Sequence, residues 1–277
     1  MHKIPVEALE KVCAGIEGTY GLHIYVNETG EEYCVGGENM LHAASTIKVP
    51  ILALLLRDAR DGKIDLNSKI GIAQGNRASG SGILKMMDPS TELTIYDMML
   101  LMITYSDNTA TNVCIDAAGG TERVTEFCRE MGLPNTVLDH KLSLTREYPV
   151  PPNRSCAADM GKIMKLISRG EFVDAEVSRG ILRFMTCQKL LTKFASGVPY
   201  EEWSDPRRDA PLPKEGYISL ASKGGTLTGK GISHDVAVVT LPDGRRYTMV
   251  LYSKTESTAA MNKVFAEIAR LMYEAMK

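Results

Sequence analysis

Strand-like patterns of hydrophobic and polar residues are confined to the two ends of the chain. They predict five strands, over residues 20–27, 31–35, 218–222, 236–241 and 247–253. The sequence Pro242-Asp243-Gly244 provides a tight turn that joins the last two strands as a hairpin. We expect all five strands to share one sheet that is built from both ends of the chain.

Between the two groups of strands, from Ser45 to about Arg183, apolar residues recur at helical spacing. Two more helices are predicted over residues 6–16 and 258–276. Strands at both ends with helices between them indicate an α/β fold with an inserted helical domain. The predicted α/β domain is therefore 1–43 with 211–277, the helical domain is 44–210, and the active site is expected in the groove between them.

Composition limits the kinds of partner. The chain has 277 residues, a formal net charge of -2 and no dense run of Lys or Arg, so nucleic acid and anionic membranes are poor candidates for a partner. The longest apolar stretch, 49–56, is too short to span a bilayer, and the first residues lack the apolar segment of a signal peptide. We expect a cytoplasmic monomer, although an exported chain whose leader has been removed would read the same.

Metal and cofactor motifs are absent from the sequence. The six cysteines include no C-x-x-C pair and have no histidine at zinc-ligand spacing, so we interpret them as buried reduced thiols. There is no P-loop and no G-x-G-x-x-G fingerprint. We therefore expect neither a metal nor a cofactor.

A candidate nucleophile and base stand together in "HAASTIKVP", where Ser45 precedes Lys48 by three residues. Pro50 is tolerated near a helix start, so the helix should begin close to Ser45 and place the two side chains side by side. A lysine with a pKa near 10.4 is a poor base at neutral pH, and lowering that pKa by about 3 units requires burial and a second cation nearby. Alone, the pair is equally consistent with a solvated lysine on a core helix.

Two further elements follow in order along the chain. They are Ser106-Asp107-Asn108, and Lys223-Gly224-Gly225 on a predicted strand. With the Ser45 motif they resemble the penicillin-recognising serine hydrolases, and their spacing is similar to that of class A β-lactamases. The resemblance covers nearly the whole chain. It implies a β-lactamase/transpeptidase-like fold, with an antiparallel five-stranded sheet flanked by helices and an inserted all-helical domain.

The resemblance also implies catalytic roles. Ser45 would be the acylated nucleophile and Lys48 its proton acceptor, while Ser106 would relay the proton to the leaving nitrogen. Lys223 would be the required second cation and could pair with a substrate carboxylate. For Asp107 a structural role is favoured over a catalytic one, because an Asp in such a turn commonly bonds local backbone N–H groups.

Substrate contacts follow from the same resemblance. Asn108 would hold a substrate amide, and Gly224, Gly225 and Thr226 would line the substrate site. The backbone N–H groups of Ser45 and Thr226 would form the oxyanion hole.

The sequence departs from the class A pattern "L-D-x-x-E-x-x-L-N" in the loop that normally carries the water-activating glutamate. Leu138 and Asp139 fit its opening, but Leu142 stands at the glutamate position and Arg146 at the asparagine position. Glu147 lies five residues late and is either a substitute on a rebuilt loop or a plain surface carboxylate. Gly224 also replaces the usual Thr or Ser, which should weaken recognition of a substrate carboxylate.

Two histidines near the predicted site have open roles. His234, at a strand entrance, and His42, just before the nucleophile, are each either functional, as a proton shuttle or carboxylate contact, or structural. The sequence thus predicts a serine acyl hydrolase that is acylated at Ser45 by a β-lactam or related amide or ester, with slow β-lactam hydrolysis. The alternatives are a penicillin-binding or acyl-sensing protein with a persistent acyl-enzyme, and an esterase or peptidase.

Overall fold

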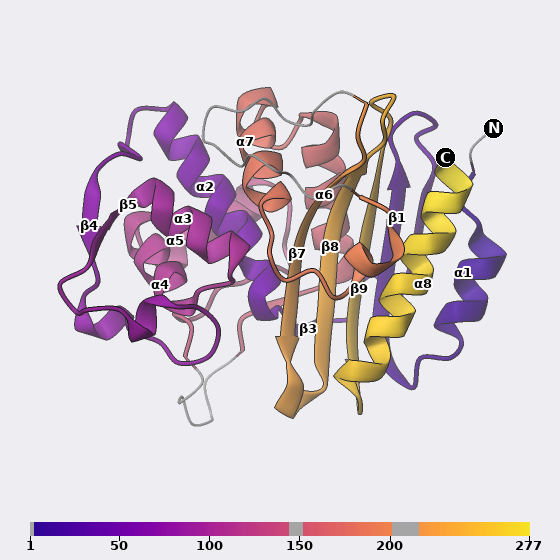
Figure 1. Cartoon of the computed structure of the whole chain (residues 1–277), viewed down its shortest axis with the longest axis horizontal. Helices are drawn as coiled ribbons and strands as arrows, with labels where there is room; N and C mark the ends of the chain where they lie inside the picture. The colour runs from indigo at the N-terminus through magenta and orange to yellow at the C-terminus, as the bar shows by residue number, and fades with distance from the viewer. Residues whose placement is uncertain (1–2, 144–151, 201–215) are drawn as a thin grey trace.

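A five-stranded antiparallel sheet forms the centre of the computed structural model, which describes residues 3–143, 152–200 and 216–277 (Figure 1). The strand order is β2-β1-β9-β8-β7. The strands are β1 (Gly18–Val26), β2 (Glu32–Val35), β7 (Ser219–Leu227), β8 (Ile232–Thr240) and β9 (Arg246–Thr255). Because β1 from the N-terminal end pairs with β9 from the C-terminal end, the prediction of one shared sheet is confirmed.

Helices cover both faces of the sheet. The terminal helices α1 (Val6–Cys13) and α8 (Thr258–Met276) lie against one face (Figure 1). The inserted segment contributes α2 (Lys48–Arg60), α3 (Ile95–Thr104), α4 (Asn108–Ala117), α5 (Thr121–Glu130), α6 (Ala157–Arg169) and α7 (Ala175–Thr186). This arrangement buries every position of β8, both its apolar run 236–239 and its polar residues Ser233, His234, Asp235 and Thr240.

Two hydrophobic clusters result from this layering. One joins α2–α7 to the inner face of the sheet and includes Val236 and Val250, and the other joins α1 and α8 to the outer face and includes Leu22 and Phe265. The boundaries of the two predicted domains and the groove between them stay predictions. Residues 211–215 of the predicted boundary lie outside the described residues.

The inserted segment is not purely helical, which corrects the sequence prediction. Strand β4 (Lys69–Gly71) pairs with β5 (Glu92–Thr94), and β6 (Arg154–Ser155) pairs with β3 (Leu41–His42). These strands have two or three residues each, too few to show a period in the sequence. Short 3-10 turns complete the described elements: η1 (Ala44–Ile47), η2 (Gln74–Asn76), η3 (Leu84–Met86), η4 (Phe194–Gly197) and η5 (Thr228–Lys230).

The cysteines are all free thiols, and five are buried as expected. Cys34 is the exception, because it lies exposed on the edge strand β2.

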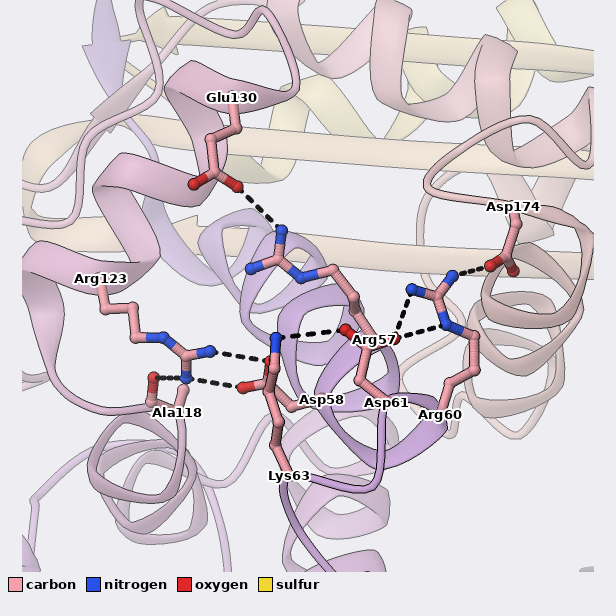
Figure 2. Close-up of polar contacts among 9 residues, drawn as sticks. All are labelled: Arg57, Asp58, Arg60, Asp61, Lys63, Ala118, Arg123, Glu130 and Asp174. Atoms are coloured by element: carbon pink, nitrogen blue, oxygen red, sulfur yellow. Dashed lines mark hydrogen bonds and ion pairs between the residues drawn. The ribbon is translucent and has the colours of Figure 1, made fainter.

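An ion-pair network anchors the C-terminal end of α2 (Figure 2). The Asp58 side chain, 1% exposed, accepts hydrogen bonds of 2.6 and 2.8 Å from the Arg123 guanidinium, which also donates to the carbonyl of Ala118. Arg57 on the same helix pairs with Glu130 of α5. Since breaking such a buried pair leaves an uncompensated charge, the network holds α2 firmly against α4 and α5.

Candidate active site

Ser45 lies in the 3-10 turn η1, which leads directly into α2 at Lys48. The predicted helix start near Ser45 is therefore confirmed, with a tighter turn as its first part. Ala44 has a φ of +47°, a left-handed conformation that costs a non-glycine residue about 1–3 kcal/mol. Its N–H donates to Nδ1 of His42 at 2.9 Å. Side-chain and backbone contacts around the turn thus sustain a strained conformation next to Ser45.

Gly225 allows strand β7 to approach this turn closely. A Cβ atom at Gly225 would lie 2.8 Å from the backbone nitrogen of Ser45 and 2.9 Å from the Cβ of Ala44. Only glycine fits there without displacing backbone. The structure therefore brings Ser45 and the Lys223-Gly224-Gly225 strand together, as the sequence predicts.

Two buried lysines meet at the Ser106 hydroxyl. Lys48 Nζ lies 3.0 Å from Ser106 Oγ and also donates to the Ser106 carbonyl and to Asn108 Oδ1. Lys223 Nζ lies 3.0 Å from the same Oγ and donates to the carbonyl of Gly224. Both lysines are 0% exposed. Among the described residues, no hydrogen bond joins the Lys48 ammonium to the Ser45 hydroxyl, and the two residues are linked only through the backbone, where the Lys48 N–H donates to the Ser45 carbonyl.

The electrostatics of this cluster meet the requirement set by the sequence. Burial lowers the pKa of Lys48 well below its ordinary value, and the positive charge of Lys223 lowers it further. Burial also lowers the pKa of Lys223 to about 7, although the Asp235 carboxylate opposes that shift. Lys223 thus supplies the second positive charge that the sequence analysis required, and the lowered pKa of Lys48 is the direction that makes a lysine a better base.

The Ser106-Asp107-Asn108 loop is held by its own polar groups. Asp107 caps α4 by accepting from the Ala110 N–H at 2.9 Å, and it also accepts from the N–H groups of Ile83 and Leu84. Its predicted role in bonding backbone N–H groups is confirmed. Ser106 has a φ of +52°, a second strained position in the site.

Asn108 is engaged at both ends of its amide. Its Oδ1 accepts from Lys48, and its Nδ2 donates to the carbonyl of Ser79 at 2.9 Å. A substrate amide would therefore have to exchange with one of these partners.

His234 and His42 both form hydrogen bonds with neighbouring backbone groups. The buried His234 ring lies 2.8 Å from the carbonyl of His42 through Nε2, and its Nδ1 accepts from the N–H of Ser253 at 3.0 Å. Burial lowers the pKa of His234 to about 3 and that of His42 to about 4, so both rings are neutral at pH 7. Since both ring nitrogens of His234 are occupied, its geometry favours a structural role over a proton shuttle.

Lys193 is a residue of this region that the sequence did not reveal. Its buried Nζ donates to the carbonyls of Gly225 (2.9 Å) and His234 (2.6 Å) and to Thr226 Oγ1 (3.0 Å). Burial lowers its pKa to about 8, against the influence of Asp235. No motif or period marks Lys193 in the sequence, because its three acceptors lie on strands at least 32 residues away.

Asp235 and Lys193 both lie next to Gly224. It accepts from the Phe194 N–H, and burial raises its pKa to about 6. A Cβ atom at Gly224 would lie 3.7 Å from both Asp235 Oδ1 and Lys193 Nζ, so a side chain could stand there in ordinary contact. Lack of space therefore does not explain why glycine, and not threonine or serine, occupies position 224.

Comparison with known proteins identifies the family of this chain. Residues 5–276 match the family model described as "Beta-lactamase enzyme family". The chain belongs to the β-lactamase enzyme family. Among curated β-lactamases, CARB-3 of Pseudomonas aeruginosa is 31% identical over 167 residues, which cover 57% of this chain and 56% of CARB-3. The chain thus matches only about half the length of such relatives at this identity.

Solved structures of β-lactamase-like proteins superpose over nearly the whole chain. The β-lactamase from Sphaerobacter thermophilus is 27% identical with a TM-score of 0.82, covering 98% of this chain and 95% of that one. A Leu-to-Glu mutant of PBP-A, solved as an acyl-enzyme complex with penicillin-G, is 25% identical with a TM-score of 0.80, covering 99% and 98%. The predicted β-lactamase/transpeptidase-like fold is confirmed.

Leu142 marks where this member of the β-lactamase family departs from the class A motif. Asn112 accepts from the Leu142 N–H at 2.7 Å and donates to the Leu142 carbonyl at 3.0 Å. The leucine side chain packs against the helical core. The backbone is thus held in a defined place, with an apolar group where the motif has a carboxylate. Glu147 and Arg146 lie outside the described residues.

Metal-binding clusters and membrane-spanning helices are both missing from the described part of this β-lactamase-like chain. Within the described residues, no three His, Cys, Asp or Glu side chains gather closely enough to hold a metal ion. None of the described helices has the length and apolar character needed to cross a membrane.

Proposed function

We propose that this chain is a serine acyl hydrolase that is acylated at Ser45 by a β-lactam or a related amide or ester, and that it hydrolyses β-lactams slowly. The observation that carries the proposal is the Ser106 hydroxyl shared by buried Lys48 and Lys223, beside the strained turn that presents Ser45. Membership of the β-lactamase family supports the same chemistry.

Acylation uses the groups of this cluster in order. Uncharged Lys48 accepts the Ser45 hydroxyl proton as Ser45 Oγ bonds to the substrate carbonyl carbon. The backbone N–H groups of Ser45 and Thr226 stabilise the oxyanion, and one such donor is typically worth about 10²–10³ in rate. As the C–N bond breaks, Ser106 donates its proton to the leaving nitrogen and regains one from the lysine pair.

Deacylation lacks an evident base. Leu142 packs an apolar side chain against the core at the position where the class A motif carries its glutamate. This observation favours, as a second candidate function, a penicillin-binding or acyl-sensing protein whose acyl-enzyme persists.

The first prediction tests covalent chemistry on the whole protein. Incubation with penicillin G should add the full mass of the β-lactam to the intact chain, and peptide mapping should locate the addition on Ser45. The adduct should decay slowly because Leu142 puts an apolar side chain where the class A motif carries its water-activating glutamate. A chromogenic ester without a carboxylate is the comparison substrate for penicillin G. Absence of an adduct with both compounds, or an adduct on another residue, would contradict the proposal.

The second prediction concerns pH and follows from Lys223. Its pKa is lowered to about 7, so its ammonium group is present below that pH and is lost above it. Acylation by a carboxylate-bearing β-lactam should therefore weaken, relative to acylation by a neutral ester, as the pH rises through about 7. The measurement is the ratio of the two second-order acylation constants between about pH 5.5 and 9.5. A ratio that does not change with pH would show that Lys223 does not contact the substrate charge.

A further inference from the structure

Three residues form a straight row across neighbouring strands on the face that meets the nucleophile turn, residues 42–46. Gly225 on β7 lies opposite His234 on β8, which lies opposite Tyr252 on β9. Each member touches the turn at a different place. Gly225 packs under the nitrogen of Ser45, His234 meets the carbonyl of His42, and the Tyr252 hydroxyl hydrogen-bonds Thr46 Oγ1.

The two rings in this row form a rigid unit. His234 and Tyr252 are both 0% exposed, and their rings stack with centroids 3.9 Å apart and planes 9° from parallel. The Ser253 N–H donates to His234 Nδ1, so the proton of the neutral ring is on Nε2 and is donated to the His42 carbonyl. The ring therefore cannot rotate without losing a buried hydrogen bond.

The turn needs such support. Ala44 is strained at a φ of +47°, and the next residue supplies both the nucleophile and one proposed oxyanion donor. An oxyanion donor acts well only within about 2.7–3.1 Å of the developing charge, so small shifts of the turn carry a large penalty. Contacts on both sides of Ser45, at residues 42 and 46, control that position.

We infer that His234 and Tyr252 are positioning residues, which hold the nucleophile turn so that the Ser45 hydroxyl and backbone N–H are correctly placed for acylation. The inference rests on the proposed function. It assigns no proton transfer to His234, and neither residue touches the substrate. Both act through residues 42–46.

Tyr252→Phe is the decisive variant, because it retains the ring stack and removes only the hydroxyl, which hydrogen-bonds Thr46 and also Ser155 on β6. The chain offers a matched control in Tyr247→Phe. Tyr247 lies on the same strand and is 1% exposed, but its hydroxyl has no hydrogen-bond partner among the described residues. Tyr252→Phe should lower the first-order acylation rate constant about 10-fold, with the noncovalent dissociation constant of the substrate changed less than about twofold. Tyr247→Phe should leave both constants within about twofold of the wild-type values.

Substitutions of His234 provide a rescue test. A glutamine amide can still donate to the His42 carbonyl, whereas a leucine cannot, so His234→Gln should acylate faster than His234→Leu. The pH profile of acylation should have the same inflections in His234→Gln as in the wild type. Loss of an inflection would indicate a proton shuttle and overturn the positioning role.

The outcomes separate this inference from the proposed function. A wild-type chain that forms no Ser45 adduct overturns the proposed function and this inference with it. A wild-type adduct combined with equal acylation rates in Tyr252→Phe and Tyr247→Phe overturns the positioning role alone. The positioning role is also overturned if Tyr252→Phe weakens substrate binding and leaves the acylation rate constant unchanged.

Discussion

Ser45→Ala should abolish covalent labelling by penicillin G and by a fluorophosphonate probe, while the protein stays folded. The change removes the atom that forms the acyl bond, and Ser45 makes no side-chain hydrogen bond among the described residues whose loss would destabilise the turn. Intact-mass measurement after prolonged incubation checks both probes. Undiminished labelling of the variant would remove Ser45 from the mechanism.

Lys48→Ala separates the base from the nucleophile in the same assay. Acylation should still occur at Ser45 but slow by about 10²–10⁴, the usual contribution of general-base catalysis. Lys69→Ala, at an exposed position on β4, is the matched control and should acylate like the wild type. If Lys48→Ala reacts within a factor of a few of the control, another group takes the proton.

Leu142→Glu should speed deacylation, because it puts a carboxylate where the class A motif carries one. The backbone of residue 142 is held on both sides by Asn112, so the new side chain starts from a fixed position. We expect the deacylation rate constant of the variant to exceed that of the wild type by a factor approaching about 10²–10⁴, the usual contribution of a general base. Some stability should be lost, because Leu142 packs against the helical core.

Leu142→Gln is the control for this change. Glutamine has nearly the same shape as glutamate, but its amide cannot accept the proton of a water molecule at neutral pH. Stopped-flow measurements should show a burst followed by slow turnover in the wild type and in Leu142→Gln, with faster turnover only in Leu142→Glu. Rapid wild-type turnover without a burst would mean that another group already activates water. Equal rates for Leu142→Glu and Leu142→Gln would show that the carboxylate does not reach the ester.

The sequence by itself predicted the long strands and helices in their order along the chain, and the resemblance of three motifs predicted the fold and the candidate groups of the site. Apolar periodicity reports which face of a strand or helix is buried, so strands at both ends and helices between them were readable without coordinates. The chemistry of Lys48 also demanded a second cation, because a lysine acts as a base at neutral pH only when burial and like charge lower its pKa. Lys223 meets that demand in the structure. Strands of two or three residues were not readable in the same way, because they contain no full period.

Only the tertiary structure decided which groups meet. The Lys48 ammonium bonds Ser106 and Asn108, 58 and 60 residues away, and in the described part of the chain it forms no hydrogen bond with the Ser45 hydroxyl. Lys193 joins two strands from a segment with no recognisable motif, and Tyr252 reaches Thr46 across 206 residues. Such contacts depend on strand register and on how helices pack against the sheet. A periodic pattern shows that a residue is buried, but the partner it meets there is fixed only when the distant elements have docked.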